Sequence, residues 1–284
     1  MANLKEIRNR ITSVSSTMQI TSAMKMVSAA KLKKAQDAII AMRPYSDKLT
    51  ELMKSFSGSV ENNKFINQRR LKNILIIAIS SNRGLCGAFN ANILKEIKVL
   101  KSKPEFKDSK FDFVTVGKKV NDSLSKNEKV IQNESEIFED LSYENTSAVA
   151  ESLMKLFLEE KYDRIDIVYN SFKNAATQKI KSEQFLPITN SEGNNSSSSN
   201  YIFEPSQEFI VDTLIPKSLK IQLFKALRDS FASEHGARMT AMHKATDNAS
   251  ELRDELKLTY NKARQASITN EILEIVGGAE ALNN

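Results

Sequence analysis

Two long segments at the ends of the chain constrain its fold most, because both are nearly free of helix breakers. Residues 3–57 contain one proline, Pro44, and no glycine, while Gly236 is the only glycine between Pro216 and Gly277. As α-helices, the two terminal segments would be about 80 Å and about 100 Å long, whereas a globular domain formed by the middle of the chain is only about 30 Å across. We therefore expect both helices to protrude from that domain.

Both terminal segments carry apolar residues at alternating spacings of three and four, the pattern of a coiled-coil seam. In the first segment, one heptad class runs without a skip through Ile7, Val14, Thr21, Ser28, Ala35, Met42, Leu49 and Phe56. Its companion runs through Leu4, Ile11, Met18, Met24, Lys31, Ala38, Tyr45 and Leu52. The shorter step after Met18 predicts one slip in register near residue 20. Pro44 is expected to bend or locally open this helix, since it removes one backbone donor.

The last segment repeats the pattern of the first. Its stripe consists of Phe224, Leu227, Phe231, His235, Met242, Ala249, Leu252, Leu256 and Ala263, and a fresh stripe follows with Ile268, Ile272, Ile275, Ala279 and Leu282. Pro216 is expected in the first turn of this helix, where proline is tolerated. Because stripes of this length are unfavourable in water, we expect the two helices to pair, and since both adjoin the same middle domain, they must run antiparallel.

The middle of the chain alternates between strand-like and helix-like segments, which is typical of an open α/β sheet. The expected strands are Lys72–Ser80, Phe111–Gly117 and Arg164–Phe172, with Thr177–Ile188 as an edge strand and Tyr201–Glu204 as its candidate partner. The expected helices lie around Ala91–Lys101, at residues 118–126 and at Glu144–Lys161. Residues Asn190–Asn200 are rich in Ser and Asn and are expected to form a loop. The sequence leaves the strand order open.

Together these patterns predict an α/β fold combined with a long antiparallel coiled coil. The first coiled-coil helix is assigned to residues 1–60, a Rossmann-like α/β domain to residues 61–205, and the second coiled-coil helix to residues 206–284. We expect no membrane-spanning helix, because no run of 18 apolar residues occurs. The N-terminus lacks the apolar core of a secretory signal, and the single cysteine, Cys86, excludes an internal disulfide.

The net charge of +6 is concentrated at one end of the chain. Residues 1–60 carry 10 Lys and Arg against 4 Asp and Glu, whereas the other two parts are close to neutral. An excess of this kind indicates an acidic partner for the first segment, although a solvated basic helix face explains it as well.

Residue patterns that usually carry chemistry are weak in this chain. The turn Gly84–Gly87 follows the first strand but matches neither GxGxxG nor a P-loop, so a tight turn explains its glycines. Cys86 has no histidine nearby in the sequence and is better read as a small buried thiol. His235 and His243 are eight residues apart, which is not the spacing of a metal pair on one helix face. We therefore predict no catalytic, cofactor-binding or metal-binding residues.

Two rival interpretations come from other classes of protein. An enzyme with a nucleotide-using α/β domain and a coiled-coil arm would need a phosphate-binding turn, which the sequence lacks. A coiled-coil adaptor could bind nucleic acid through the basic run Lys25–Lys34, but no aromatic residues for base stacking lie nearby. Salt-dependent binding of DNA or RNA would distinguish the adaptor.

Four stretches of the chain decide between these interpretations. They are ITSAMKMVSAAKLKKAQ (Ile20–Gln36), SNRGLCGAFN (Ser81–Asn90), SEHGARM (Ser233–Met239) and YNKARQASITNEILEIVGGAEAL (Tyr260–Leu282). In this order and at these distances from the termini, they resemble the gamma subunit of bacterial F-type ATP synthases. The resemblance covers both ends and the first strand and loop of the middle, while residues 100–205 agree only in their α/β pattern.

The resemblance implies a non-catalytic central rotor shaft, which couples proton or sodium flow through a membrane ring to ATP synthesis or hydrolysis at the beta subunits by rotation. The implied partners are three alpha and three beta subunits, an epsilon subunit and the c-ring. The implied location is peripheral, on the cytoplasmic side of the bacterial inner membrane, with membrane association only through the complex. No cofactor and no nucleic acid are expected.

The resemblance also implies two groups of contact residues. Residues that match family positions at the beta subunits, together with two basic residues of the first helix, are Lys25, Lys31, Arg238, Arg264, Gln265, Thr269 and Glu271. The apolar residues expected to turn inside a bearing formed by the ring are Ile268, Ile272, Ile275, Val276 and Leu282. The coupling ion, the c-ring size, regulation by epsilon and the role of residues 190–200 do not follow from the sequence.

Overall fold

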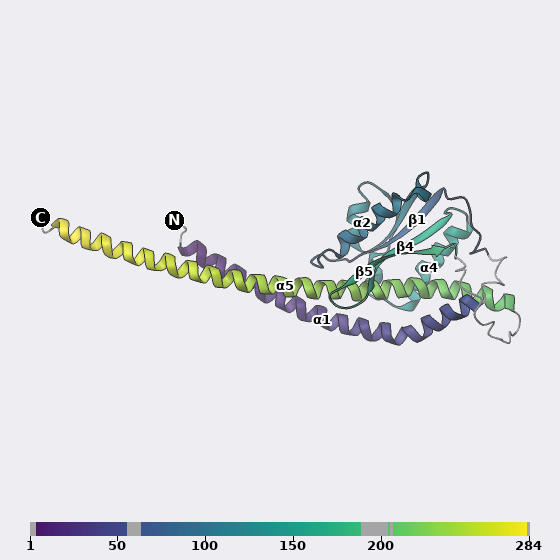
Figure 1. Ribbon diagram of the computed structural model, residues 1–284, viewed down its shortest axis with the longest axis horizontal. Coiled ribbons are helices and arrows are strands. Elements are labelled where there is room, and N and C mark those ends of the chain that lie inside the picture. Colours follow the sequence, from purple (N-terminus) through teal and green to yellow (C-terminus); the bar gives the residue numbers. More distant parts are fainter. Residues whose placement is uncertain (1–3, 56–63, 189–203, 205–206, 283–284) are drawn as a thin grey trace. The chain divides into compact units, whose positions relative to one another are not determined.

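The computed structural model describes residues 4–55, 64–188, 204 and 207–282 (Figure 1). Its helices are α1 (Leu4–Ser55), α2 (Phe89–Lys101), α3 (Lys118–Leu124), α4 (Tyr143–Leu158) and α5 (Gln207–Leu282), with short 3-10 turns η2 (Pro104–Phe106) and η3 (Ser135–Phe138). Its strands are β1 (Asn73–Ile79), β2 (Lys110–Val116), β3 (Lys129–Asn133), β4 (Arg164–Phe172) and β5 (Gln178–Leu186). The expected boundaries near residues 60 and 205, and the loop at residues 190–200, lie outside the described residues.

The chain divides into two compact units, of which the first is made of residues 1–28 and 239–284. Here the ends of α1 and α5 pack together: the Thr246 hydroxyl donates to the Thr21 hydroxyl (2.9 Å), and Arg253 Nη1 lies 3.6 Å from Met18 Sδ. The partner on α1 moves toward the N-terminus as the partner on α5 moves toward the C-terminus. The helices are therefore antiparallel, which confirms the predicted pairing.

The buried stripe of α1 corrects one detail of the predicted seam. Leu32, Ile39 and Ser46 are buried, and they continue the heptad class of Met18 without a slip. Lys31 and Tyr45, which the predicted slip placed in the seam, are exposed. The slip is wrong because the class passes through two polar residues, Lys25 and Ser46. The sequence alone gave no reason to place these in a seam, although a lysine stem can lie half-buried with its charge in water.

The two prolines lie inside long helices. Both α1 and α5 continue through them, at Pro44 and Pro216. Pro216 was expected in a first turn, but α5 begins at Gln207, so that expectation is wrong. The neighbours Ile215 and Leu219 are almost fully buried. Burying such side chains is worth about 1.5–3 kcal/mol each, which offsets the cost of about 3 kcal/mol for proline in a helix interior.

The second unit, residues 29–238, is built around a five-stranded sheet in the order β3-β2-β1-β4-β5. The first four strands are parallel, and β5 is an antiparallel edge strand, as expected for Thr177–Ile188. Its candidate partner at residues 201–204 lies almost wholly outside the described residues. Strand β3 was not foreseen, because five residues with half-exposed side chains give too short a pattern.

Helices cover both faces of this sheet (Figure 1). On one face, side chains of α2 and α3, such as Ile93 and Val120, pack on Ile74 and Ile76 of β1. On the other face, α4 and the first part of α5 pack on alternate residues of the same strand, including Ile77. Strand β1 is therefore buried on both sides, which is why it reads as a continuous apolar run.

Gly117, between β2 and α3, lies close to the backbone of Ser80, where the loop after β1 begins. Its φ is +108°, and a Cβ at this position would lie 2.4 Å from the Ser80 carbonyl oxygen. The Ser80 hydroxyl donates to the Gly117 carbonyl (3.2 Å) and accepts the Val120 amide (3.2 Å). Only glycine fits this close approach.

Replacing Gly117 with Ala is expected to lower the free energy of unfolding by about 2–4 kcal/mol, because it adds both backbone strain and a steric clash. Gly87→Ala is the matched control: its φ is also positive (+60°), but open space surrounds the added Cβ. The control should cost only about 1 kcal/mol. Urea unfolding of both variants measures the difference, and equal losses would contradict the role of the clash.

Candidate functional site

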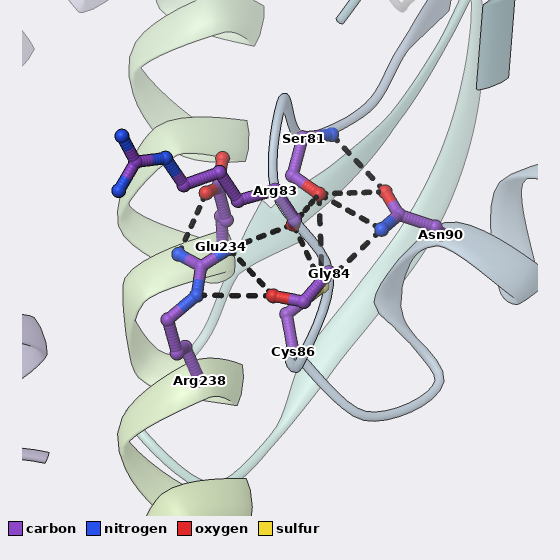
Figure 2. A network of polar contacts seen from close by, with 7 residues as sticks. All are labelled: Ser81, Arg83, Gly84, Cys86, Asn90, Glu234 and Arg238. Carbon is purple, nitrogen blue, oxygen red and sulfur yellow. Dashed lines mark hydrogen bonds and ion pairs between the residues drawn. The ribbon is translucent and has the colours of Figure 1, made fainter. Parts of the chain in front are cut away.

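The loop that follows β1 contains a network of polar contacts within the second unit (Figure 2). The Ser81 amide donates to Asn90 Oδ1 (3.0 Å), and Asn90 Nδ2 donates to Ser81 Oγ (2.8 Å) and to Cys86 Sγ (3.3 Å). Ser81 Oγ donates in turn to the Arg83 carbonyl (2.7 Å). Asn90, in the first turn of α2, thus fixes the loop from inside. Leu85, with φ +62°, remains exposed at its tip.

Arg238 of α5 joins this loop to the long helix (Figure 2). Its Nη2 donates to the carbonyl oxygens of Arg83 (2.9 Å) and Gly84 (3.3 Å), while Nη1 pairs with Glu234 one turn earlier (2.7 Å). Both charged side chains are buried. A buried guanidinium is favourable only when its hydrogen bonds are satisfied. The planar group of Arg238 achieves this because it donates both to the loop carbonyls and to the Glu234 carboxylate.

The orientation of this loop decides what it can bind. A phosphate-binding turn points backbone N–H donors toward its ligand. Here the carbonyl oxygens of Arg83 and Gly84 point at the guanidinium group of Arg238, so this face of the turn favours positive charge. Burial raises the pKa of Glu234, and the nearby Arg238 opposes that shift. Burial also raises the pKa of Cys86, which keeps the thiol protonated and confirms its interpretation as a small buried thiol.

His235 is buried beside this network in an unusual state. Its ring packs edge-on against Phe231 (4.5 Å between centroids), and its Nδ1 has no hydrogen-bond partner among the described residues. Burial, with smaller contributions from Arg238 and Lys31, lowers the pKa of His235 to about 3. The ring is therefore neutral at ordinary pH. No group of three or more His, Cys, Asp or Glu side chains in the described ranges is placed to hold a metal ion.

The C-terminal part of α5 carries the predicted bearing residues on its surface. Ile268 (48% exposed), Ile272 and Val276 are uncovered, and Ile275 is 71% exposed. Within the first unit, α5 continues as a helix beyond the N-terminal end of α1 (Figure 1), so no described helix packs against this stripe. The side chain of Leu282 lies outside the described residues. Leu273, which the sequence analysis did not single out, is also exposed.

The predicted contact residues fall into different environments. Four of them, Arg264, Gln265, Thr269 and Glu271, are exposed on the same stretch of α5 as the apolar stripe. Lys31 is exposed and Lys25 half-buried on α1.

Arg238 differs from the other predicted contact residues because it is buried and bonded within its own chain. A contact of Arg238 with a beta subunit stays a prediction. Sequence reasoning missed its partner Glu234, although the spacing of four residues on one helix is the usual signal for such a pair.

Comparison with known proteins gives the same assignment over the whole chain. The model of the family described as ATP synthase matches residues 3–282. The ATP synthase gamma chain of Christiangramia forsetii is 66% identical over 100% of both chains, and that of Flavobacterium johnsoniae is 64% identical over the same share. The chain belongs to the family of ATP synthase gamma chains. The resemblance seen in the four motifs is thereby confirmed, with bacterial relatives.

Membership makes this chain a gamma subunit of an F-type ATP synthase. As predicted, it is a subunit of a larger complex and not an enzyme of its own. That complex is membrane-associated, and none of the gamma chain's described helices is long and apolar enough to cross a bilayer.

Solved structures of other ATP synthases contain chains with the same fold. A chain from the rotor of the Euglena gracilis mitochondrial ATP synthase, in rotational state 1, matches with a TM-score of 0.69 and 22% identity, covering 93% of this chain and 98% of that one. A second chain, from the OSCP/F1/c-ring structure of that enzyme in rotational state 3, gives a TM-score of 0.73 at 22% identity, covering 98% and 94%. Both chains therefore share the fold of this gamma chain.

Replacing His235 with Gln is expected to change how stability depends on pH. Between its ordinary value of 6.5 and about 3, the unfolded chain binds a proton on His235 that the folded chain does not. The free energy of unfolding therefore falls as the pH drops through this window. When the pH falls from 7 to about 4.5, the free energy of unfolding should decrease by about 2 kcal/mol more for the native gamma chain than for the His235→Gln variant.

Urea unfolding at a series of pH values measures this difference. Burial also raises the pKa of Glu234 and Asp229, which act in the opposite direction as the pH falls, but both groups are present in the two proteins. Their effect therefore cancels in the comparison. Parallel stability curves for the two proteins would contradict the buried neutral state of His235.

Proposed function

We propose that this gamma chain is the central shaft of a rotary ATP synthase, and that it couples ion flow through a membrane ring to ATP synthesis or hydrolysis at the beta subunits. The observation that carries the proposal is the end of α5, where a row of exposed isoleucines continues past the first turn of α1. An exposed apolar row of this kind is unfavourable in water and marks a surface that binds a partner. An apolar bearing inside a ring of subunits provides one, and it leaves the helix free to turn.

Rotation performs work in this scheme because the shaft is asymmetric. Two unequal helices cannot contact three equivalent beta subunits in the same way. Each angle of the shaft therefore favours a different set of beta conformations, and differences in binding free energy link the angle to the state of each nucleotide site. The gamma chain supplies no group to the chemistry.

Polar residues beside the apolar stripe are proposed to grip the beta subunits. Arg264, Gln265, Thr269 and Glu271 are exposed and lie within two turns of one helix. Their donors and acceptors can therefore change partners as the shaft turns. The exposed Lys31 and the half-buried Lys25 are proposed to face acidic segments of the beta subunits, in line with the excess positive charge of residues 1–60.

We further propose three alpha and three beta subunits, one epsilon subunit and the c-ring as the partners of this chain. Its place is then on the cytoplasmic side of the bacterial inner membrane, where it is held by the complex. Support comes from the family membership and from the net charge, which suits protein partners of acidic character.

Co-purification tests the proposed assembly. A tagged gamma chain expressed with its own alpha and beta subunits should recover three copies of each per tagged chain, measured by native mass spectrometry. A tagged chain that recovers neither subunit, although it is folded by circular dichroism, would overturn the proposed function.

Removing the bearing is expected to weaken coupled ATP synthesis without unfolding the rest of the gamma chain. Deletion of residues 268–284 takes away side chains that are exposed where the structure describes them, at residues 268–279, so the urea midpoint should change little. A triple variant, Ile268→Gln, Ile272→Gln and Ile275→Gln, keeps the helix, since Gln is a good helix former, and removes only its apolar surface. Both variants should lower ion-driven ATP synthesis in reconstituted vesicles. Unchanged synthesis in both would count against the bearing.

A further inference from the structure

The order of the strands creates a topological switch point, the place where other α/β proteins bind ligands. From β1 the chain crosses to β2 on one side, and later to β4 on the other side, so the direction of winding reverses between β1 and β4. In open α/β sheets, ligands bind outside the carboxyl ends of the strands at such a switch point. In this gamma chain, the loop 80–88 and the turn after β4 lie there.

One stretch of α5 contacts both sides of this switch point. At the end of β4, the Ser171 hydroxyl donates to Asp229 (3.1 Å). In the turn that follows, the carbonyl oxygen of Ala175 would lie only 3.1 Å from a Cβ on Gly236, so the helix backbone approaches closely there. After β1, Arg238 donates to the carbonyls of the loop, as described above. These three contacts span fewer than three turns of one helix.

The chemistry of these contacts matches that of a bound ligand more than that of ordinary core packing. Asp229, Glu234 and Arg238 are all buried although they carry ionisable groups, and each has a polar partner in the described residues. Nearer its start, α5 meets the sheet through apolar side chains such as Leu223 and Leu227. The change from apolar to charged contacts occurs where the helix reaches the carboxyl ends of β1 and β4.

We propose that residues Asp229–Arg238 fill the switch-point crevice as a built-in ligand, and that the contact of Arg238 with the loop after β1 is the joint that makes the α/β domain turn with the shaft. The proposal rests on the proposed rotary function and deepens it. Arg238 is a positioning residue in this scheme: it holds the loop and touches no nucleotide. The edge of the sheet that binds small molecules in enzymes binds the rotor helix here.

Arg238→Leu in the assembled complex tests this joint. The number of ions pumped per ATP hydrolysed should fall at least about twofold, because torque on α5 is then transmitted incompletely to the domain. Arg228→Leu is the matched control. Arg228 is also on α5, and it donates to the Leu141 carbonyl (2.7 Å) and stacks on Phe224, but it lies outside the crevice. The control should keep the pumping ratio near that of the native complex.

The double variant Glu234→Leu/Arg238→Leu separates coupling from stability. The single change leaves the Glu234 carboxylate buried and unpaired, which is destabilising, whereas removing both partners is close to neutral. The double variant should therefore recover the native melting temperature of the gamma chain but keep the low pumping ratio. If Arg238→Leu does not assemble, the double variant alone carries the test.

Three outcomes would overturn the proposal: a native pumping ratio in Arg238→Leu, an equal loss in Arg228→Leu, or recovery of both stability and pumping in the double variant. None of these outcomes would contradict the rotary function, because that function is tested separately by ion pumping in the native complex. If the native complex formed but pumped no ions, the rotary function would fail first. The two proposals are thus distinguishable in one set of vesicles.

Discussion

The burial of α5 around nearly its whole circumference between Ile215 and Arg238 is the constraint on which the second unit depends. A helix this deeply buried is stable where its surface is apolar or where its charged groups find partners. The first part of this stretch is apolar, and its Leu219 and Leu223 belong to the hydrophobic core. The later part carries charged side chains that have polar partners, namely Asp229 and the Glu234–Arg238 pair. These charged groups lie at the carboxyl edge of the sheet.

The same helix serves a different purpose in the first unit. Past residue 238 it carries a narrower seam, with Met242 and Ala249 buried against the end of α1, and then no described partner. One continuous helix therefore changes from a core element to one strand of a coiled coil and finally to an uncovered rod. Each change follows the side chains: a helix with fewer apolar residues per turn requires less cover, and the last stripe of isoleucines is exposed.

Much of this arrangement follows from the sequence. The strands at β1, β2, β4 and β5 and the pairing of the terminal helices have strong periodic signals, because burial selects apolar residues at regular spacing. The errors have particular causes. Lys25 and Ser46 hide the true seam of α1, since polar residues occupy seam positions, and β3 is too short to show a period. The crevice contacts of Asp229 and Arg238 could not be foreseen, because they depend on the strand order, which local patterns do not encode.

The hydroxyl pair of Thr21 and Thr246 joins residues that are 225 positions apart. Contacts of such long sequence separation form late, because closing a large loop costs entropy before any contact repays it. On the ribosome, α1 is made well before its matching stretch of α5. The apolar stripe of α1 therefore lacks this partner until the matching stretch of α5 is made, and apolar surface exposed in this way favours aggregation.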